Sequence, residues 1–419
     1  MKLVIKKRKS ISTKKALLLF FAALLFFVLS FAHVQNLADV TKHEREMDQL
    51  LRRPVNMDSL WKSFLVNETD KELGEPYKVY PIDVDYAGQN IHATLVEYPF
   101  GNSPRVDAQD VFPRGIMLYV HGYNDYFFQR EMAEKADSAG LAFFAIDLHY
   151  CGRSYREGDA RADMRNLKEY YRELDYAIEL SRQMIKEKVE KEAMANRDSA
   201  AESFIEVHNK AMAIPFVIVG HSMGGLLTSL YVNDHPQNKF DAVVLNSPFF
   251  DFNYGYFLRK GVVPLVSTIA MYLPDYALGS TGNPNYAYSI FKGEKGEWEY
   301  NLEWKSLERP KQYLGWVRAI YMGQLQVQKG LHINSPVLVL HGDCNEKGEE
   351  WNDNYTHCDG VLDVEHIKGW SPNVGKNVKT VEVNGALHDV FLSKKPARDF
   401  AYETMFKFID SALVKSRGK

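Results

Sequence analysis

The chain has 419 residues, of which 46% are hydrophobic and 25% charged, so it can bury a sizeable core. Its formal net charge is −3, but the charges are unevenly distributed. Residues 1–32 carry seven basic side chains and no acidic one, which leaves a net charge of −10 on the remainder. This acidic body argues against a nucleic-acid partner, because such binding depends on neutralising phosphates.

The N-terminus is typical of an export signal. Seven basic side chains within residues 1–15 precede an apolar run, 16–32, in which Ser30 is the only polar residue. A basic flank stays on the cytoplasmic side while the apolar run enters the membrane, so we expect an exported, extracytoplasmic protein. Ser30-Phe31-Ala32 has the small-x-small pattern of a cleavage site, yet 17 residues are also barely enough to span a bilayer. Two outcomes stay open: secretion or periplasmic release after cleavage near Ala32, and membrane association through residues 16–32.

Beyond this signal, a polar segment precedes a body in which strands alternate with helices. Residues 33–75 carry charge in nearly every turn and are predicted to form a polar N-terminal stalk. From residue 76, short apolar runs alternate with helix-compatible stretches, which predicts an α/β domain with a mostly parallel sheet. The predicted strands are 77–84, 91–97, 116–120, 141–146, 216–219, 242–245, 337–340 and 378–383. The predicted helices are 126–139, 164–192, 223–234 and 396–413, with a charged, solvated helical extension over 184–212.

One insertion interrupts the alternation. Residues 252–334 separate two predicted strands and are rich in Tyr, Phe and Trp. An insertion at this point emerges at the carboxyl ends of the parallel strands, where this architecture binds its ligands. We therefore expect 252–334 to form a cap that covers the site and supplies an apolar pocket. The core is then divided into a first part, 76–251, and a second part, 335–419.

The strongest chemical signal is the G-x-S-x-G sequence Gly220-His221-Ser222-Met223-Gly224. It stands directly after an apolar strand-like run and directly before a helix-like segment. A serine on such a sharp turn needs small neighbours, because its backbone is strained and closely packed. The following helix points its N-terminus at the site and stabilises developing negative charge. The pattern predicts Ser222 as a nucleophile.

A serine nucleophile needs a base, which in turn needs an orienting acid. After a G-x-S-x-G turn, the acid and then the histidine follow in the chain. Among the histidines beyond the insertion, His388 lies in a loop between the last predicted strand and the last predicted helix. His357 and His366 are less suitably placed. We predict His388 as the base.

The acid should lie just beyond the predicted strand 337–340. Asp343, Asp353, Asp359 and Asp363 all follow this strand. Asp343 is closest to the strand end, whereas Asp359 opens a segment that leads into the next helix. Spacing alone does not choose between Asp343 and Asp359.

An acyl-transfer site also needs two backbone N–H donors for the oxyanion of its tetrahedral intermediate. One donor is the residue after the nucleophile, Met223, and the other comes from the loop after the third strand. That loop begins His121-Gly122-Tyr123, so we predict the Tyr123 N–H as the second donor.

Together, several short motifs resemble the monoacylglycerol lipase and lysophospholipase branch of the α/β-hydrolases, which shares its fold with serine aminopeptidases. The matching motifs are His121-Gly122-Tyr123, Asp147 with Gly152-Arg153-Ser154, Gly220–Gly224, Asn246-Ser247-Pro248, His341-Gly342 and Gly385–His388. The resemblance covers about residues 76–415 and implies the α/β-hydrolase fold: a mostly parallel central sheet flanked by helices, with an inserted cap. In that family the acid opens an x-V-x-D-like segment, which residues 359–363 match. The resemblance therefore favours Asp359, although residues 343–358 form an extra stretch before it.

The three cysteines are consistent with export, since disulfides persist outside the cytoplasm. Cys344 and Cys358 flank the extra stretch, and a bridge between them would return Asp359 to the strand end. We predict this disulfide, with Cys151 left as a buried thiol. The alternative is two free cysteines that flank the stretch by coincidence.

These residues predict a serine hydrolase that cleaves carboxylic esters of monoacylglycerol, lysophospholipid or similar acyl substrates through an acyl-enzyme. The chemistry requires no cofactor, and no His/Cys cluster has the spacing of a metal site. One alternative is a peptidase or amidase with the same three residues. Another is a catalytically dead binding protein of this fold.

Overall fold

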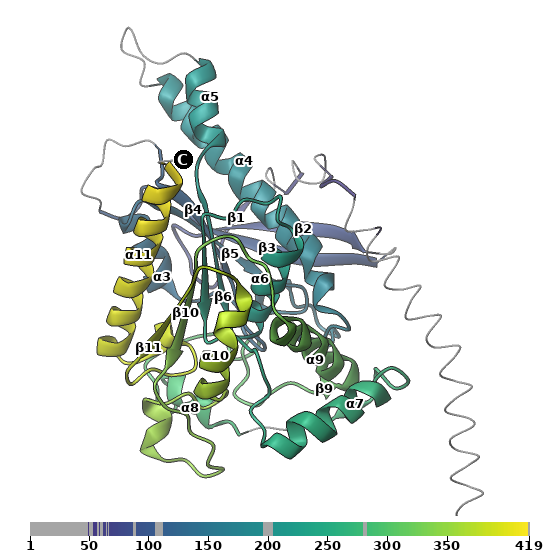
Figure 1. Ribbon diagram of the computed structural model, residues 1–419. Coiled ribbons are helices and arrows are strands. Elements are labelled where there is room, and N and C mark those ends of the chain that lie inside the picture. Colours follow the sequence, from purple (N-terminus) through teal and green to yellow (C-terminus); the bar gives the residue numbers. More distant parts are fainter. Residues whose placement is uncertain are drawn as a thin grey trace, which may run out of the picture.

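The computed structural model describes residues 67–417 apart from 87–88, 105–111, 196–203 and 280–282, together with scattered positions between 49 and 66. A central sheet is covered by helices on both faces (Figure 1). The predicted export segment, residues 1–32, lies outside the described residues. Within the described residues, no helix has both the length and the apolar character that crossing a membrane requires.

The central sheet has nine strands in the order β1-β2-β3-β5-β4-β6-β7-β10-β11. The strands are β1 Glu68–Thr69, β2 Lys78–Tyr86, β3 Gln89–Tyr98, β4 Gly115–Val120, β5 Leu141–Asp147, β6 Phe216–His221, β7 Ala242–Asn246, β10 Val337–Gly342 and β11 Val378–Val383. The pairs from β1 to β5 are antiparallel, and every pair from β5 to β11 is parallel. The mostly parallel sheet predicted from the sequence is confirmed.

Helices and short helical turns connect these strands. The helices are α3 Arg130–Ser138, α4 Tyr171–Ala195, α5 Phe204–Met212, α6 Met223–Asp234, α7 Val263–Ile269, α8 Asn285–Ile290, α9 Leu314–Lys329, α10 Val364–Trp370 and α11 Lys395–Arg417. The shorter turns used below are η1 Gly152–Ser154, η2 Leu167–Tyr170, the π-turn η3 Leu258–Val262 and η4 Asp353–Thr356. A small second sheet joins β8 Ala277–Leu278 to β9 Gln312–Tyr313.

The core consists of two apolar layers, one on each face of the sheet. Alternate residues of β4 belong to opposite layers, because side chains alternate along a strand. Ile116 and Leu118 pack in the layer that contains α4, α6 and α9, whereas Met117 and Tyr119 pack in the layer that contains α3 and α11. All six residues of β4 are buried, which explains why this strand is a continuous apolar run in the sequence.

The predicted strands agree with the observed ones to within two residues at each end. Helix α3 begins four residues later than predicted, because the residues before it form an extended loop tied to β5 through Phe127. The predicted helix 164–192 begins as η2, where Asn166 and Glu169 form a capping box, and continues as α4.

The helical extension predicted over 184–212 is less solvated than expected. Met184, Ile185 and Val189 of α4 are buried, as are Val207 and Ala211 of α5. Charged residues dominate this segment in the sequence, but apolar residues at helical spacing form a buried stripe along α4 and α5.

The sheet begins before residue 76. β1 pairs antiparallel with β2, and Asp70, which is 2% exposed, pairs with Arg153 beyond β5. The end of the segment predicted as a polar stalk is therefore part of the folded body, because its carboxylate is needed to balance a buried guanidinium.

The insertion 252–334 leaves the sheet after β7 and returns before β10. It contains η3, α7, α8 and α9, and Figure 1 shows α7, α8 and α9 at one end of the sheet. α7 packs on α9, and α9 packs on α6. These contacts place the insertion beside the helix that follows Ser222.

Candidate active site

Ser222 lies on the turn between β6 and α6. Its backbone has φ 53° and ψ −114°, a strained conformation for a residue with a side chain. The Ser222 N–H donates to the Asn246 carbonyl at 2.9 Å, and the Ser222 carbonyl accepts from the Phe249 N–H at 3.0 Å. The neighbouring strand β7 and the loop after it thus hold the turn in place.

The two glycines of the motif are needed because the backbone packs too closely for a side chain. A Cβ on Gly220 would lie 2.5 Å from the Gly224 carbonyl oxygen. A Cβ on Gly224 would lie 2.2 Å from the His121 carbonyl oxygen. Both distances are well below van der Waals contact, so only glycine allows α6 to start directly against the end of β4.

The structure brings Ser222, His388 and Asp359 into one hydrogen-bonded row. His388 Nε2 lies 2.9 Å from Ser222 Oγ, and His388 Nδ1 lies 2.9 Å from Asp359 Oδ2. Ser222 is 8% exposed, His388 3% and Asp359 0%. The second oxygen of Asp359 accepts from the backbone N–H groups of Val361 and Leu362, each at 2.8 Å. These bonds orient the carboxylate toward the imidazole.

The other candidate acids lie elsewhere. Asp343 is exposed and accepts from the Gly385 N–H at 2.8 Å. Asp363 caps α10 and pairs with Lys347, and exposed Asp353 begins η4. Asp359 is the candidate acid that contacts His388.

The predicted disulfide between Cys344 and Cys358 is confirmed, with a Cα–Cα distance of 4.9 Å. The bridge closes the extra stretch at its base. Beside it, the Asp359 N–H donates to the Cys344 carbonyl at 2.9 Å. Asp359 therefore lies next to the end of β10 despite the intervening residues. Cys151 is a buried free thiol, as predicted.

The loop after β4 contacts the nucleophile. A Cβ on Gly122 would lie 3.2 Å from Ser222 Cβ, so the loop passes directly over the serine. His121 Nε2 accepts from the Leu148 N–H at 3.0 Å, which leaves Nδ1 protonated to donate to the Gly122 carbonyl at 2.7 Å. In a trans peptide the next N–H, that of Tyr123, points opposite to this carbonyl. His121 therefore sets the direction of the predicted Tyr123 donor.

The second predicted donor, Met223, is the first residue of α6. N–H groups in the first turn of a helix have no intrahelical acceptor and point out of the helix end. The Met223 N–H is thus available beside Ser222, where the helix dipole adds partial positive charge.

Two further residues hold His388, and the sequence analysis assigned them no role. Asp389 is fully buried and accepts from Asn246 Nδ2 at 2.7 Å and from Gln129 Nε2 at 3.1 Å. Asn246 Oδ1 accepts from the Val390 N–H at 3.2 Å. The same asparagine also supports Ser222 through its carbonyl, so it couples the serine turn to the histidine loop. The sequence signal that could have identified Asn246 is its place as a polar residue at the end of a buried apolar strand.

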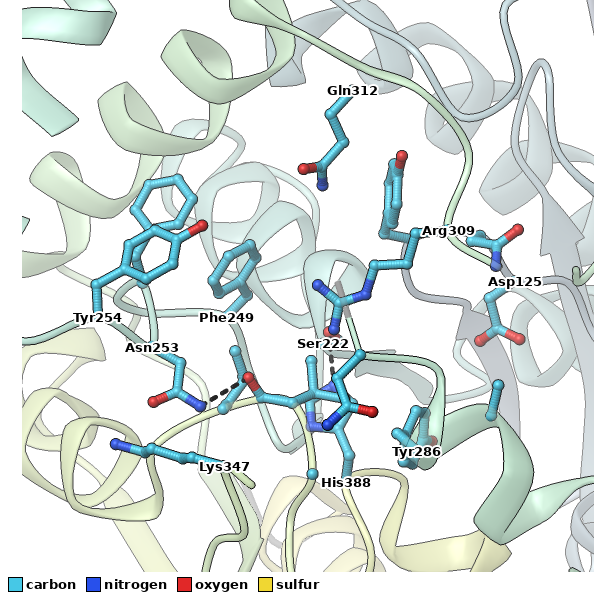
Figure 2. Close-up of a pocket in the computed structure, with 18 of the residues that line it drawn as sticks. Asp125, Ser222, Phe249, Asn253, Tyr254, Tyr286, Arg309, Gln312, Lys347 and His388 are labelled. Atoms are coloured by element: carbon cyan, nitrogen blue, oxygen red, sulfur yellow. Dashed lines mark hydrogen bonds between the residues drawn. The ribbon is translucent and has the colours of Figure 1, made fainter. Parts of the chain in front are cut away.

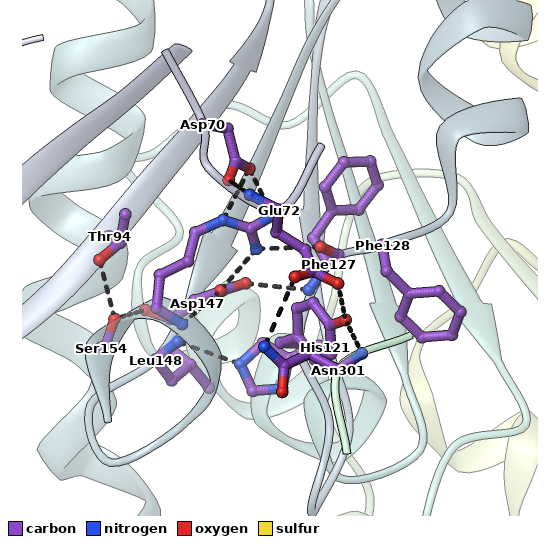
Figure 3. Close-up of polar contacts among 12 residues, drawn as sticks. Asp70, Glu72, Thr94, His121, Phe127, Phe128, Asp147, Leu148, Ser154 and Asn301 are labelled. Carbon is purple, nitrogen blue, oxygen red and sulfur yellow. Dashed lines mark hydrogen bonds and ion pairs between the residues drawn. The ribbon is translucent and has the colours of Figure 1, made fainter. Parts of the chain in front are cut away.

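Arg153 forms a second buried network, and Figure 3 shows three of its partners, Asp70, Asp147 and Phe127, close together. Its Nη1 donates to Asp147 Oδ2 at 2.8 Å and to the Phe127 carbonyl at 2.9 Å, and its Nε donates to Asp70 Oδ2 at 2.7 Å. Asp147 Oδ1 in turn accepts from the Phe127 N–H at 2.9 Å. The motif of Asp147 with Gly152-Arg153-Ser154 therefore supports the loop rather than the reaction itself.

A cavity of about 560 Å³ opens beside Ser222 and His388. Figure 2 shows the two residues together in its wall, with Tyr286 from α8 and Phe249 close by. More than half of the lining residues come from the insertion. The apolar ones from this segment are Phe252, Leu258, Val262, Val263, Val266, Leu278, Ala287, Ile290, Leu307, Trp316 and Val317. The insertion thus supplies an apolar pocket at the serine, as the sequence analysis expected.

Burial lowers the pKa of His221, which also lines the cavity, and this effect outweighs the opposing influence of Asp389 and Asp125. Its ring centroid lies 4.9 Å from that of His388. With its pKa lowered, His221 adds no positive charge beside His388 at neutral pH. Within the described residues, no group of three or more His, Cys, Asp or Glu side chains is arranged to hold a metal ion.

Together, this fold and this serine site define an α/β-hydrolase. A family model described as serine aminopeptidase, S33, matches residues 191–348, which include Ser222. A monoacylglycerol lipase of Mycolicibacterium smegmatis is 24% identical over 236 residues, covering 56% of this chain and 71% of that protein. A soluble variant of the Saccharomyces cerevisiae monoglyceride lipase, solved with a substrate analogue, has a TM-score of 0.52 at 16% identity. That alignment covers 79% of this chain and 94% of the yeast chain, and it shows the likeness of fold.

The chain therefore has the α/β-hydrolase fold, and over part of its length it is similar to the serine aminopeptidase family model and to a monoacylglycerol lipase.

Proposed function

We propose that this enzyme hydrolyses monoacylglycerols, lysophospholipids or closely similar acyl esters, with Ser222 as nucleophile, His388 as base and Asp359 as orienting acid. The observation that carries the proposal is the row of 2.9 Å contacts from Ser222 Oγ through His388 to Asp359, in the wall of an apolar cavity. An unassisted hydroxyl is a poor nucleophile, and this geometry provides its activation.

The first half of the reaction forms an acyl-enzyme. Ser222 Oγ attacks the ester carbonyl while His388 Nε2 accepts the hydroxyl proton. Asp359 stabilises the imidazolium through the Nδ1–H bond and does not itself become protonated. The tetrahedral intermediate collapses when His388 donates the proton to the departing alcohol, leaving the acyl group on Ser222. Water, activated by His388, then attacks the acyl-enzyme and releases the fatty acid.

The oxyanion of each tetrahedral intermediate would bind the backbone N–H groups of Tyr123 and Met223. Such donors are effective because they are fixed before the reaction begins, and the loss of one typically costs about 100- to 1,000-fold in kcat. The proximity of the Gly122 loop to Ser222 and the orientation set by His121 support this assignment.

The shape and chemistry of the cap favour a substrate with an apolar chain. One side of the segment 257–266 lines the cavity, whereas Phe257 and Leu265 of the same segment do not line it and are 76% and 59% exposed. Large exposed apolar side chains mark surfaces that meet apolar partners. A substrate that partitions into lipid aggregates fits this combination.

A peptidase or amidase activity is the second candidate, because the matching family model is described as serine aminopeptidase. An aminopeptidase needs a carboxylate for the ammonium group of its substrate. The two carboxylates that line this cavity, Asp125 and Glu346, are already engaged. Asp125 pairs with Lys305, and Glu346 accepts from Asn354 and from two backbone N–H groups. This arrangement favours the ester substrate.

A substrate panel tests the proposal. The wild-type enzyme should hydrolyse monoacylglycerols or lysophospholipids well above aminoacyl amides. Ser222→Ala should lower kcat by at least about 10,000-fold, because members of such a catalytic unit are not replaceable one at a time. Its thermal unfolding midpoint serves as the control for folding. Retention of more than a few per cent of the activity by this variant would refute the assignment.

We further propose that the enzyme acts outside the cytoplasm, either anchored by residues 16–32 or released after cleavage near Ala32. The confirmed disulfide supports this proposal, since such bonds persist in oxidising compartments. Recovery of the full-length protein in the cytoplasmic fraction would contradict it. Mass spectrometry of the mature N-terminus separates the two forms.

A further inference from the structure

The loop that carries the Tyr123 N–H is bonded to the cap at three consecutive residues. These bonds join Tyr123 Oη to the Pro310 carbonyl at 3.4 Å, Asn124 Nδ2 to the Ser306 carbonyl at 2.9 Å, and Lys305 Nζ to Asp125 Oδ1 at 2.7 Å. Asn124 lies at φ 50°, in the left-handed region, which asparagine adopts more readily than most residues with a side chain. The cap therefore bonds to the loop over Ser222 as well as forming the cavity.

The ion pair between Asp125 and Lys305 is buried. The two side chains are 3% and 9% exposed, and the Lys305 ammonium lies 5.7 Å from the centre of the Phe128 ring and 5.8 Å from that of Tyr300. Burial raises the pKa of Asp125, but Lys305, followed by His221 and His121, outweighs burial and brings that pKa to about 2. The carboxylate is therefore ionised at neutral pH and depends on Lys305 for its compensation.

Asp125 also acts on the backbone of the loop. Its Oδ2 accepts from the Gly122 N–H at 3.3 Å, while the Gly122 carbonyl accepts from His121. Gly122 is consequently held at both of its backbone polar groups: its N–H by Asp125, and its carbonyl, which belongs to the peptide linking Gly122 to Tyr123, by His121. Tyr123 contributes the N–H that the proposed mechanism directs at the oxyanion.

We propose that Lys305 is a positioning residue for the hydrolysis: it pairs with Asp125, fixes the Gly122–Tyr123 peptide against Ser222, and cancels a carboxylate charge that would oppose the developing oxyanion. Fixed donors around a developing charge are a large contribution to catalysis, and an uncompensated buried charge of the same sign weakens them. The inference rests on the proposed function, because it concerns the same oxyanion.

The test compares Lys305→Met, Lys305→Arg and the double variant Lys305→Met with Asp125→Asn. Lys292→Met is the matched control, since Lys292 forms an exposed ion pair with Glu299 within the same cap. Three quantities are measured on a soluble p-nitrophenyl ester: kcat, KM, and the inhibition constant of an alkyl trifluoromethyl ketone. This inhibitor forms a tetrahedral adduct with an oxyanion, so its affinity reports on the oxyanion donors and not on the acyl pocket alone.

Lys305→Met should lower kcat about 10- to 100-fold with KM changed little, as expected for a displaced catalytic group. The ketone should bind weaker by a similar factor. Lys305→Arg should keep most of the activity, and the double variant should recover part of the lost kcat, because the unpaired charge is gone. Lys292→Met should match the wild type.

An unchanged kcat and ketone affinity in Lys305→Met would overturn the inference, as would a loss confined to KM. If Lys305→Met does not fold, the double variant carries the test, since it buries no unpaired charge. Weaker ketone binding by the folded double variant than by Lys292→Met supports the inference, and equal binding by the two overturns it. Ser222→Ala separates the two proposals: if that variant stays active, the proposed function fails, whatever the Lys305 variants do.

Discussion

At the scale of single residues, the choice of Asp359 over Asp343 depends on which carboxylate reaches His388. Spacing left the two candidates equal, and Asp343 is the nearer to the end of β10 in sequence. The disulfide from Cys344 to Cys358 reverses this order in space, because it draws the residue after the extra stretch back to the strand end. A covalent link between distant positions is a constraint that local spacing cannot reveal.

Replacement of each aspartate by asparagine tests this choice. Asp359→Asn should lower kcat by about 10,000-fold, because the amide no longer stabilises the imidazolium or fixes its tautomer. Asp343→Asn should change kcat by about twofold at most, since its amide oxygen can still accept from the Gly385 N–H at an exposed position. Steady-state kinetics on one soluble ester measures both variants. The opposite ranking would transfer the role of acid to Asp343.

Several positions of the site were recognised from sequence only as parts of motifs. Asn246, His121 and Arg153 all stand in the quoted motifs, but their roles depend on partners more than 20 positions away in the chain. Asn246 bonds Asp389, and Arg153 bonds Asp70. Ser222 and His388 were predictable because the strand-to-helix turn and the chain order identify them locally, whereas hydrogen-bond partners across the fold have no local signal.

At the scale of elements, the cap supplies most of the wall of the cavity beside Ser222. The short segment formed by η3 and α7 presents Val262, Val263 and Val266 to the cavity and packs on α9. The sequence predicted the insertion by its length and aromatic content. It did not predict which side of each helix faces the cavity, because both sides of this segment are apolar.

A bulky residue on α7 should change chain-length preference. Val266→Trp should fill part of the cavity and lower kcat/KM for long-chain relative to short-chain monoacylglycerols by about tenfold. Leu265→Trp is the control, because Leu265 stands on the same helix, is 59% exposed and does not line the cavity. The rate of labelling by a small fluorophosphonate should be similar in both variants. An unaltered chain-length profile in Val266→Trp would show that α7 does not contact the acyl chain.

At the scale of the whole molecule, the mostly parallel character of the sheet and the bounds of its longer strands followed from the sequence. The buried strands are continuous apolar runs, and parallel strands joined by helices allow few arrangements. The N-terminal boundary was less predictable. Asp70 stands among polar residues in the sequence, yet its side chain is buried, where it pairs with Arg153. A buried position of this kind cannot be recognised from the sequence, because its residue is charged and its partner lies far away in the chain.

The whole account centres on Ser222 as the residue that carries the acyl group. The most direct test is peptide mass spectrometry of the full-length enzyme after reaction with a fluorophosphonate, which phosphonylates only an activated serine. The account predicts a single adduct, on the peptide that contains Ser222, and loss of that adduct after prior incubation with excess monoacylglycerol. An unlabelled protein, or an adduct on any other residue, would contradict it.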